Sequence, residues 1–355
     1  MNIRSVKVDE LTPAELTAWS EIQLATPLLS NPHFRPEFTQ ALAVVRSDIE
    51  VAVLEEGGRP VGFLPFRRSS WNIGRPAAGP LSDYHAVIAP AGLPCDPFEL
   101  VRACHLKAWR FDHLVELHPA FRDFAWSSAE SPYVDISAGW DAYRKDERTS
   151  GFAKGHDQKM RKLAREIGPV RFEWHVPDPA LLDQMFEWKS QQYRRTKIDD
   201  VFAHAWTREL MHRLLATQTE HFAPVFSVTY VNDRVAALTF GIRAGAVLHP
   251  WFPAYDVELG KYSPGMLHWV ETLKSCEQAG VGRLDLVSGG DSYKQRMMNG
   301  SIQVLQGAVD PRSSVVAAGR AWRRTREYVR TSPMYRGFRG PARVLKSVKG
   351  WLELR

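Results

Sequence analysis

One structural plan occurs twice along this 355-residue chain, as amphipathic helical sequence followed by a β-hairpin. In the first half, strands at 49–54 and 61–66 flank a turn with two glycines. In the second half, strands at 225–231 and 235–240 flank the turn residues Asn232 and Asp233. Matching the two turns offsets the halves by 175 residues. Because the chain is too long for one ordinary domain, the repetition predicts a duplicated fold.

The order of the remaining elements indicates the fold class. Two amphipathic helices precede each hairpin, at 13–23 and 36–45 in the first half and at 179–196 and 207–217 in the second. A strand at 246–252, a helix at 264–279, a strand at 283–287, a short helix and a strand at 302–309 follow the second hairpin. This order predicts an α/β (α+β) fold with a mixed sheet. We expect an N-terminal domain at 1–149, a basic connecting helix at 150–168, a C-terminal domain at 169–311 and a basic helical tail at 312–355.

Charge and composition narrow the setting in which the chain works. The tail at 312–355 contains twelve Lys or Arg and two Glu, whereas the whole chain carries a formal charge of +6. Such a tail can contact phosphates or anionic lipid, or it can be a solvated charged helix. No apolar run is long enough to span a membrane, and we expect a soluble, cytoplasmic protein, with peripheral membrane contact through the tail as an option. The three cysteines lack paired spacing, so no metal site is expected.

The helix that begins at Pro264 has a sequence suited to binding an anion. Ser263 is a good N-cap, Pro264 fits the first helical position and Gly265 adds no side-chain bulk. The free amides of a helix start attract negative charge, although an ordinary capped helix has the same sequence features. The strand before this helix carries His249 and leads to Asp256, which both become candidates for a general base. A buried, hydrogen-bonded histidine is the alternative for His249.

Further polar residues cluster near the expected carboxyl ends of strands, where ligands of α/β sheets bind. Asp285, the pair Gly289-Gly290 and the pair Tyr293-Lys294 follow the strand at 283–287. In the first half, Asp83 and Tyr84 follow a Gly-Pro turn, where they line an acceptor cleft or stabilise the turn. Lys189 and Tyr193 lie on one side of a helix beside Trp188 and Gln192, which suits stacking on a sugar or plain helix packing.

Several of these motifs occur together in one order: Arg35-Pro36-Glu37-Phe38, Arg59 to Pro65, Leu81-Ser82-Asp83-Tyr84, Gly168-Pro169, Ser263-Pro264-Gly265, and Asp285 with Gly289-Gly290 and Tyr293-Lys294. Over about residues 10–310 this set resembles the CelD/BcsL-type acetyltransferases of cellulose and exopolysaccharide biosynthesis. The resemblance implies a tandem GNAT (acyl-CoA N-acyltransferase) fold, related to the Fem-type aminoacyl transferases, with the donor groove in the C-terminal copy.

The resemblance also implies roles for individual residues. The diphosphate of coenzyme A would rest on the loop that contains Lys261, Tyr262, Ser263 and Gly265, although the usual Gly-x-Gly or Gly-x-Ala signature is absent. A backbone amide of the strand at 246–252 would stabilise the oxyanion. Because both flank the end of this strand next to the candidate groove, His249 and Asp256 are our candidates for the base, and Tyr293 is our candidate to protonate the leaving thiolate. Lys294 would contact a phosphate or the acceptor, and Asp83, Tyr84, Lys189, Tyr193 and Asp285 would bind the acceptor.

The expected function is transfer of an acetyl or other acyl group from acyl-CoA to an amine or hydroxyl of a sugar in surface polysaccharide biosynthesis. Acyl-CoA would be a co-substrate, and neither a bound cofactor nor a metal is expected. A Fem-like transferase that uses aminoacyl-tRNA is one alternative; otherwise nucleic acid is not an expected partner. A non-catalytic protein that docks on a membrane synthase through the basic tail is another alternative.

Overall fold

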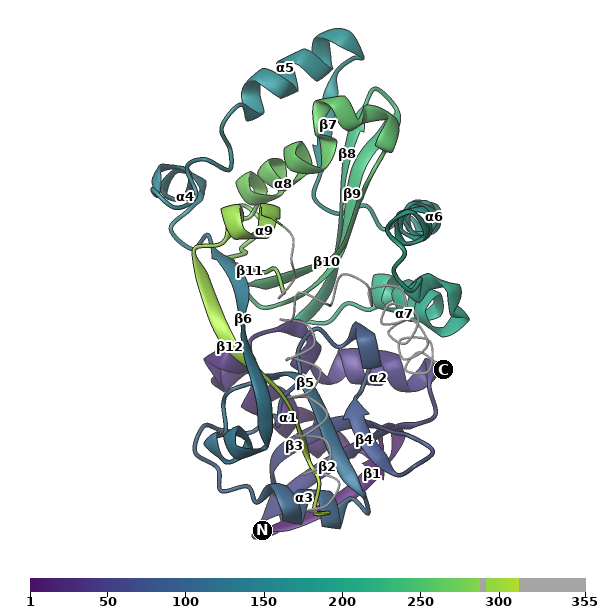
Figure 1. Ribbon diagram of the computed structural model, residues 1–355, viewed down its shortest axis with the longest axis vertical. Helices are drawn as coiled ribbons and strands as arrows, with labels where there is room; N and C mark the ends of the chain where they lie inside the picture. The colour runs from purple at the N-terminus through teal and green to yellow at the C-terminus, as the bar shows by residue number, and fades with distance from the viewer. Residues whose placement is uncertain (288–291, 313–355) are drawn as a thin grey trace, which may run out of the picture.

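The computed structural model describes residues 1–287 and 292–312, so Gly289, Gly290 and the tail beyond Arg312 lie outside the described residues. Twelve strands form one sheet in the order β1-β2-β3-β4-β5-β12-β6-β11-β10-β9-β8-β7 (Figure 1). The strands are β1 (Asn2–Lys7), β2 (Ile49–Glu56), β3 (Arg59–Arg68), β4 (Ile73–Pro76), β5 (Ala108–Val115), β6 (Ala125–Asp135), β7 (Val170–Glu173), β8 (Phe222–Val231), β9 (Arg234–Ala244), β10 (Val247–Tyr255), β11 (Arg283–Asp285) and β12 (Gly300–Val309). The α-helices are α1 (Pro13–Ala25), α2 (Pro36–Val45), α3 (Pro97–Ala103), α4 (Trp140–Lys145), α5 (His156–Glu166), α6 (Pro179–Thr196), α7 (Ala205–Ala216), α8 (Pro264–Ser275) and α9 (Ser292–Met297).

The sheet consists of two halves with the same pairing pattern. β1 to β5 form one half and β7 to β11 the other, and each half has one parallel pair, β4 with β5 and β10 with β11. β12 lies between β5 and β6, and β6 lies between β12 and β11. Each half is therefore completed by the last strand of the other half, which confirms the predicted duplication and the mixed α/β fold. The expected domain boundaries at residues 149 and 168 remain predictions.

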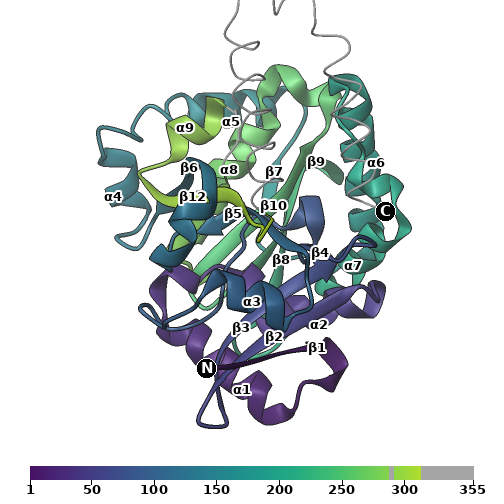
Figure 2. The same cartoon turned by 60° about the horizontal axis from the view of Figure 1, so that its bottom comes forward.

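The helices cover both faces of the sheet, and one core is common to the two halves. Alternate residues of β2 point to opposite faces, so Val51 and Val53 join one core while Ala52 and Leu54 join another. The first core contains buried side chains from α1, α2, α6 and α7 together. α3 covers the other face of the N-terminal half, and α8 covers the other face of the C-terminal half (Figure 2). Burial of these apolar side chains in one continuous core fixes the two halves relative to each other.

Local sequence accounts for where the helices begin. Thr12 and Glu15 form a capping box at the start of α1, and Asp178 caps α6 ahead of Pro179.

α2 and α6 have the predicted bounds, whereas α8 ends at Ser275, four residues earlier than expected. The structure also has β4, β5 and β6 between the first hairpin and the connecting helix, where no strand is predicted from the sequence. No helix among residues 1–287 and 292–312 is long and apolar enough to cross a membrane.

A buried histidine links stability to pH. The His268 ring lies between β8 hydroxyls, with Nε2 3.0 Å from Ser227 Oγ and Nδ1 2.9 Å from Thr229 Oγ1. Burial lowers the pKa of His268 from 6.5 to about 3. Between these two values the unfolded chain binds a proton that the folded chain does not, so stability falls as the pH falls.

We predict that the His268→Gln variant has a flatter dependence of stability on pH than the wild-type protein. On going from pH 7 to pH 5, protonation of His268 in the unfolded chain should lower the free energy of unfolding of the wild-type protein by about 2 kcal/mol. Glutamine does not titrate, so the variant should not show this decrease. Urea unfolding at the two pH values measures the difference. An unchanged difference between pH 7 and pH 5 in the variant would contradict the assignment.

Candidate active site

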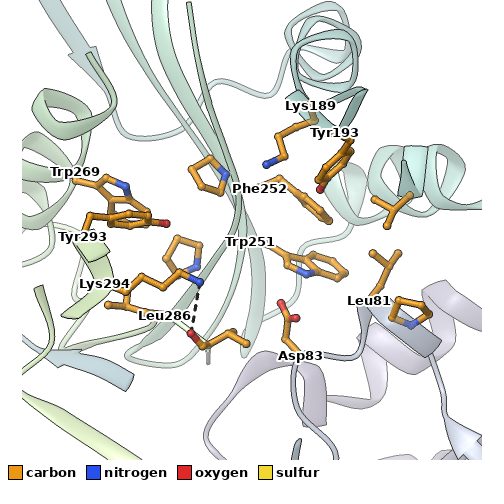
Figure 3. Close-up of a pocket in the computed structure, with 15 residues that line it drawn as sticks. Leu81, Asp83, Lys189, Tyr193, Trp251, Phe252, Trp269, Leu286, Tyr293 and Lys294 are labelled. Carbon is orange, nitrogen blue, oxygen red and sulfur yellow. Dashed lines mark hydrogen bonds between the residues drawn. The ribbon is translucent and has the colours of Figure 1, made fainter. Parts of the chain in front are cut away.

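The site begins where two strands of the C-terminal half separate. β10 and β11 pair in parallel only at Val247 with Arg283 and at Leu248 with Leu284. β11 ends at Asp285, whereas β10 continues to Tyr255. A cavity of about 240 Å³ lies at this opening (Figure 3). It is lined by Pro80, Leu81, Asp83, Lys189, Tyr193, Val201, Pro250, Trp251, Phe252, Pro253, Trp269, Leu286, Val287, Tyr293 and Lys294.

In the N-terminal half, the corresponding opening between β4 and β5 is closed by the chain itself. The segment after β4 forms the 3₁₀ helix η4 (Gly79–Leu81) and then bridges to β5 at His85 and to β3 at Ile88. The same segment carries Pro80, Leu81 and Asp83 into the cavity of the C-terminal half. The N-terminal half thus has no such opening of its own. Its segment forms one wall of the cavity in the C-terminal half, and this wall carries the Asp83 carboxylate.

Asp83 forms a hydrogen bond with a histidine of the C-terminal half, His249. His249 of β10 is fully buried, and its Nε2 lies 3.0 Å from Asp83 Oδ2. The Asp83 side chain is 26% exposed and faces the cavity, as Figure 3 shows. Burial opposes ionisation of Asp83, but the hydrogen bond from His249 and the nearby imidazoles outweigh it, so the pKa of Asp83 lies below its usual value. The carboxylate is therefore ionised at neutral pH and can receive a proton or orient a donor.

A buried network extends from this pair to the end of β11. The His33 ring packs edge-on against His249, with ring centroids 4.6 Å apart. His33 Nδ1 lies 2.9 Å from Asn31 Oδ1, and Asn31 Nδ2 donates to Asp285 Oδ2 at 2.7 Å. Burial and the neighbouring His249 lower the pKa of His33 to about 3, so this ring is neutral. The sequence does not point to His33 and Asn31, because nothing in a short Pro-His turn marks it as a partner of residues more than two hundred positions away.

Donor atoms of His33, Asp83 and His249 all lie within 4.8 Å of one another. Two imidazoles and a carboxylate are a donor set that divalent transition metals also use. Asp83 and His249 already bind each other, and His33 already binds Asn31. These existing contacts describe a hydrogen-bonded network that joins the two halves at the cavity.

Two lysines and two tyrosines surround the same space. Lys189 Nζ of α6 donates to Gln192 Oε1 at 2.9 Å and lies 4.9 Å from the ring centre of Tyr193. Burial, together with Asp200 and Asp83, raises the pKa of Tyr193, which keeps its hydroxyl protonated. From the opposite wall, Lys294 Nζ donates to the Val287 carbonyl at 3.4 Å. Figure 3 shows the Tyr293 hydroxyl turned toward this space. The structure thus brings together the predicted Asp83, Lys189, Tyr193, Tyr293 and Lys294.

β10 presents few backbone amides to the cavity. Of the lining residues 250–253, Pro250 and Pro253 have no N–H, so only Trp251 and Phe252 can donate. The pairing with β9 is irregular here, because Pro250 pairs with Gly241 and Phe252 with Phe240, and Trp251 has no partner between them. A bulge at this point leaves Trp251 outside the regular pairing of β10 with β9.

Three predicted acceptor or base residues lie elsewhere. Asp256 caps the 3₁₀ helix η7 (Val257–Tyr262) and forms an ion pair with Arg234, beside a second cavity and apart from His249. The expectation that His249 and Asp256 lie together beside one groove is therefore wrong, because they lie toward opposite ends of β10. Tyr84 is buried, with its hydroxyl 2.7 Å from Ser131 Oγ, and Asp285 is fully buried between Asn31 and Arg283. None of Asp256, Tyr84 and Asp285 lines the cavity that contains Asp83.

The start of α8 is less open than its sequence indicates. Ser263 adopts a left-handed conformation (φ 58°), and its carbonyl accepts from the amides of Met266 and Leu267. Pro264 has no N–H, which leaves the Gly265 amide as the only one of the first turn without an acceptor among residues 1–287 and 292–312. Side chains of α5 also lie here, where Lys159 Nζ donates to Ser263 Oγ at 3.1 Å. Among the residues that line the Asp83 cavity, α8 contributes Trp269 alone.

The other residues predicted to hold the diphosphate lie around the same helix start. Tyr262 is buried and donates to Glu166 Oε2 at 2.8 Å, and Lys261 Nζ lies 3.7 Å from the same carboxylate oxygen. Lys159 and Lys261 thus place two cationic side chains near the start of α8, with the Glu166 carboxylate beside Lys261. An anion there would be bound mainly by lysine side chains, and not by a row of free amides.

Glycine 241 of β9 allows β10 to bulge toward the cavity. A Cβ atom at this position would lie 2.6 Å from the His249 carbonyl oxygen and 3.0 Å from Pro250 Cα. Both contacts are with backbone, which cannot rotate away as a side chain can. The glycine is therefore required for the position of His249 and of the amides that follow it.

We predict that Gly241→Ala destabilises the protein by about 1–3 kcal/mol and lowers turnover, because β10 must shift to relieve the overlap. Gly151→Ala is the matched control, since a Cβ there meets no atom within 4 Å. Denaturant unfolding and steady-state kinetics of both variants test the prediction. Wild-type stability in Gly241→Ala would show that the close contact does not constrain β10.

Comparison with known proteins identifies a family for the C-terminal half. Residues 150–295 match the model of an acetyltransferase (GNAT) domain family. This range contains every cavity-lining residue of the C-terminal half, whereas Asp83 lies outside it. No protein with a curated description matches the chain.

Solved structures resemble the chain over both halves. A conserved protein of unknown function from Bacteroides thetaiotaomicron has a TM-score of 0.56 at 10% identity, with 85% of this chain and 98% of that chain covered. The C-terminal domain of a candidate lysylphosphatidylglycerol synthetase from Agrobacterium fabrum has a TM-score of 0.55 at 12% identity, with 86% and 93% covered. FemX has a TM-score of 0.52 at 11% identity, with 86% and 96% covered. At such low identity these likenesses show the fold alone. The family match over residues 150–295 shows that the C-terminal half contains an acetyltransferase (GNAT) domain and that the chain is an acyltransferase, and the two halves of its mixed α/β sheet repeat one plan.

Proposed function

We propose that the chain transfers an acyl group from acyl-CoA to an amine or hydroxyl of a sugar or sugar-linked intermediate in surface polysaccharide assembly. The observation that carries the transfer chemistry is the Asp83–His249 pair, built from both halves at the opening between β10 and β11. The ordered motifs shared with the CelD/BcsL-type enzymes support the class of acceptor. The acetyltransferase domain match supports a thioester donor.

The first step requires a base near the acceptor. As the acceptor nitrogen or oxygen attacks the thioester carbonyl, a bond to carbon forms and the attacking atom must lose a proton. Asp83 faces the cavity and His249 stands behind it, so the proton can be taken up by this pair as a unit. His33, itself neutral and anchored by Asn31, packs against His249 and fixes its ring.

The negative charge that develops on the carbonyl oxygen needs a donor. The amides of Trp251 and Phe252 are the only ones on the lining stretch of β10, and Lys294 adds positive charge from the opposite wall. When the carbon–sulfur bond breaks, the thiolate takes a proton from a neighbouring acid, a role that we assign to Tyr293. Both reacting groups would then be held between residues from the two halves, so positioning contributes to the rate.

An aminoacyl-tRNA donor is the second candidate function. The specific observation in its favour is the likeness of the fold to FemX over 86% of this chain. The helix α5, with Lys159, Arg161, Lys162 and Arg165, could contact phosphates of either CoA or RNA. A docking role through the basic tail rests on residues outside the described ones and remains a prediction.

The donor can be decided directly. Purified protein should release thiol from acetyl-CoA in the presence of amino sugars, and the released thiol should match the acetylated product in amount. Aminoacyl transfer from charged tRNA, with no thiol release from acetyl-CoA, would favour the second candidate. Such transfer should also weaken steeply with salt, because RNA contacts release counterions.

We predict that Asp83→Asn lowers kcat by about 10²–10³-fold, because the amide cannot accept the proton, and leaves the KM for acetyl-CoA near the wild-type value. Asp183→Asn is the control, since Asp183 lies on the exposed side of α6 and contacts His212 only weakly. Steady-state kinetics with both variants measure the effect. A kcat near the wild-type value in Asp83→Asn would show that the Asp83–His249 pair does not act as the base.

A further inference from the structure

A second cavity, of about 350 Å³, lies between α6 and the end of β10. It is lined by Gln184, Trp188, Gln191, Gln192, Arg195, Arg234, Val235, Ala254, Tyr255, Asp256, Val257 and Glu258. None of these residues lines the cavity that contains Asp83, and the transfer chemistry proposed above uses none of them. We call this space the outer cavity and the space beside Asp83 the inner cavity.

The two cavities are neighbours along the same helix and the same strand. On α6, residues 184, 188, 191 and 195 repeat at helical spacing and face the outer cavity. Lys189 and Tyr193 form the adjoining stripe and face the inner cavity. On β10, residues 250–253 line the inner cavity, and Ala254 and Tyr255 line the outer one. The hydrogen bond from Lys189 to Gln192 joins the two stripes, so the cavities lie side by side along α6.

The positive and negative side chains that line the outer cavity are equal in number. Arg234 Nε donates to Asp256 Oδ2 at 2.6 Å, and Arg234 Nη2 donates to Glu258 Oε2 at 2.6 Å. With Arg195 the lining contains two arginines and two carboxylates. This balance does not favour a diphosphate or another strongly charged group. An uncharged, polar ligand fits it better.

The remaining lining residues are of the kind that bind sugars. Trp188 is half-buried and Tyr255 is 43% exposed, so both offer aromatic surface to a ligand. The amides of Gln184, Gln191 and Gln192 each carry donor and acceptor atoms that suit hydroxyl groups. Aromatic surface binds the apolar face of a sugar ring, and amide side chains bind its hydroxyls.

We infer that the outer cavity is a binding subsite for a glycan chain, which holds the sugar units next to the unit acylated in the inner cavity. This inference rests on the proposed function, since it names how an extended acceptor would be bound. It predicts that the enzyme prefers an oligosaccharide over the single sugar. The preference would arise in binding and not in the chemical step.

The test uses glucosamine and its β-1,4-linked tetramer as acceptors, with acetyl-CoA as donor. The Trp188→Ala variant should raise the KM for the tetramer by about tenfold, the effect of losing one aromatic contact, and leave the KM for glucosamine unchanged. Because Trp188 also packs against the core, the exposed Gln191→Leu variant provides a second test that does not endanger folding. Glu187→Ala is the control, since Glu187 is exposed on α6 and lines neither cavity.

Binding measurements separate this inference from the proposed function. Saturation-transfer NMR with the glucosamine tetramer and with cellotetraose reports binding even if no acetyl transfer occurs. Binding that is lost in Trp188→Ala and Gln191→Leu, without turnover, would support the subsite and reject the proposed reaction. Turnover with equal KM for glucosamine and tetramer, or tetramer binding unaffected by both variants, would overturn the subsite. No binding of either tetramer by the wild-type protein at millimolar concentration would also overturn it.

Discussion

The early separation of β10 from β11 is the constraint on which the site depends. Two residue pairs hold these strands together, and beyond Leu248 the edge of β10 borders a cavity. Unpaired backbone inside a protein is costly, so the opening persists only where the surroundings or a ligand satisfy it. Here the bulge at Trp251, the room left by Gly241 and the prolines on either side shape the strand edge toward the cavity.

The two halves differ at the place where their parallel strands separate. In the N-terminal half, the segment from Ala77 to Ala89 fills the space and buries its apolar side chains there. That filling segment carries Asp83 to the other half, where it meets His249. The exchange of β6 and β12 places the halves in one sheet, and α1, α2, α6 and α7 share one core. A carboxylate from one copy can therefore be held within hydrogen-bonding distance of an imidazole from the other.

Local sequence predicted the elements but not the long-range contacts. The hairpins, α2, α6 and the start of α8 follow from periodicity, turn residues and caps, which act within a few residues. The exchange of β6 and β12 could not be predicted, because the strands that pair are distant in sequence and similar in pattern. Among site residues, Asp83, Lys189, Tyr193, Tyr293 and Lys294 do line one cavity. Asp256 lies apart from His249 because six residues of extended strand separate them, and His33 cannot be predicted from local sequence because its partners come from tertiary contacts alone.

A structure of the protein with acetyl-CoA tests the central claim most directly. The account predicts that the thioester carbonyl oxygen lies about 3 Å from the amide of Trp251 or Phe252, with the Asp83 carboxylate facing the carbonyl carbon. It also predicts that the diphosphate lies near Lys159 and Gly265. A thioester bound in the outer cavity or in the N-terminal half, away from the Asp83–His249 pair, would contradict it.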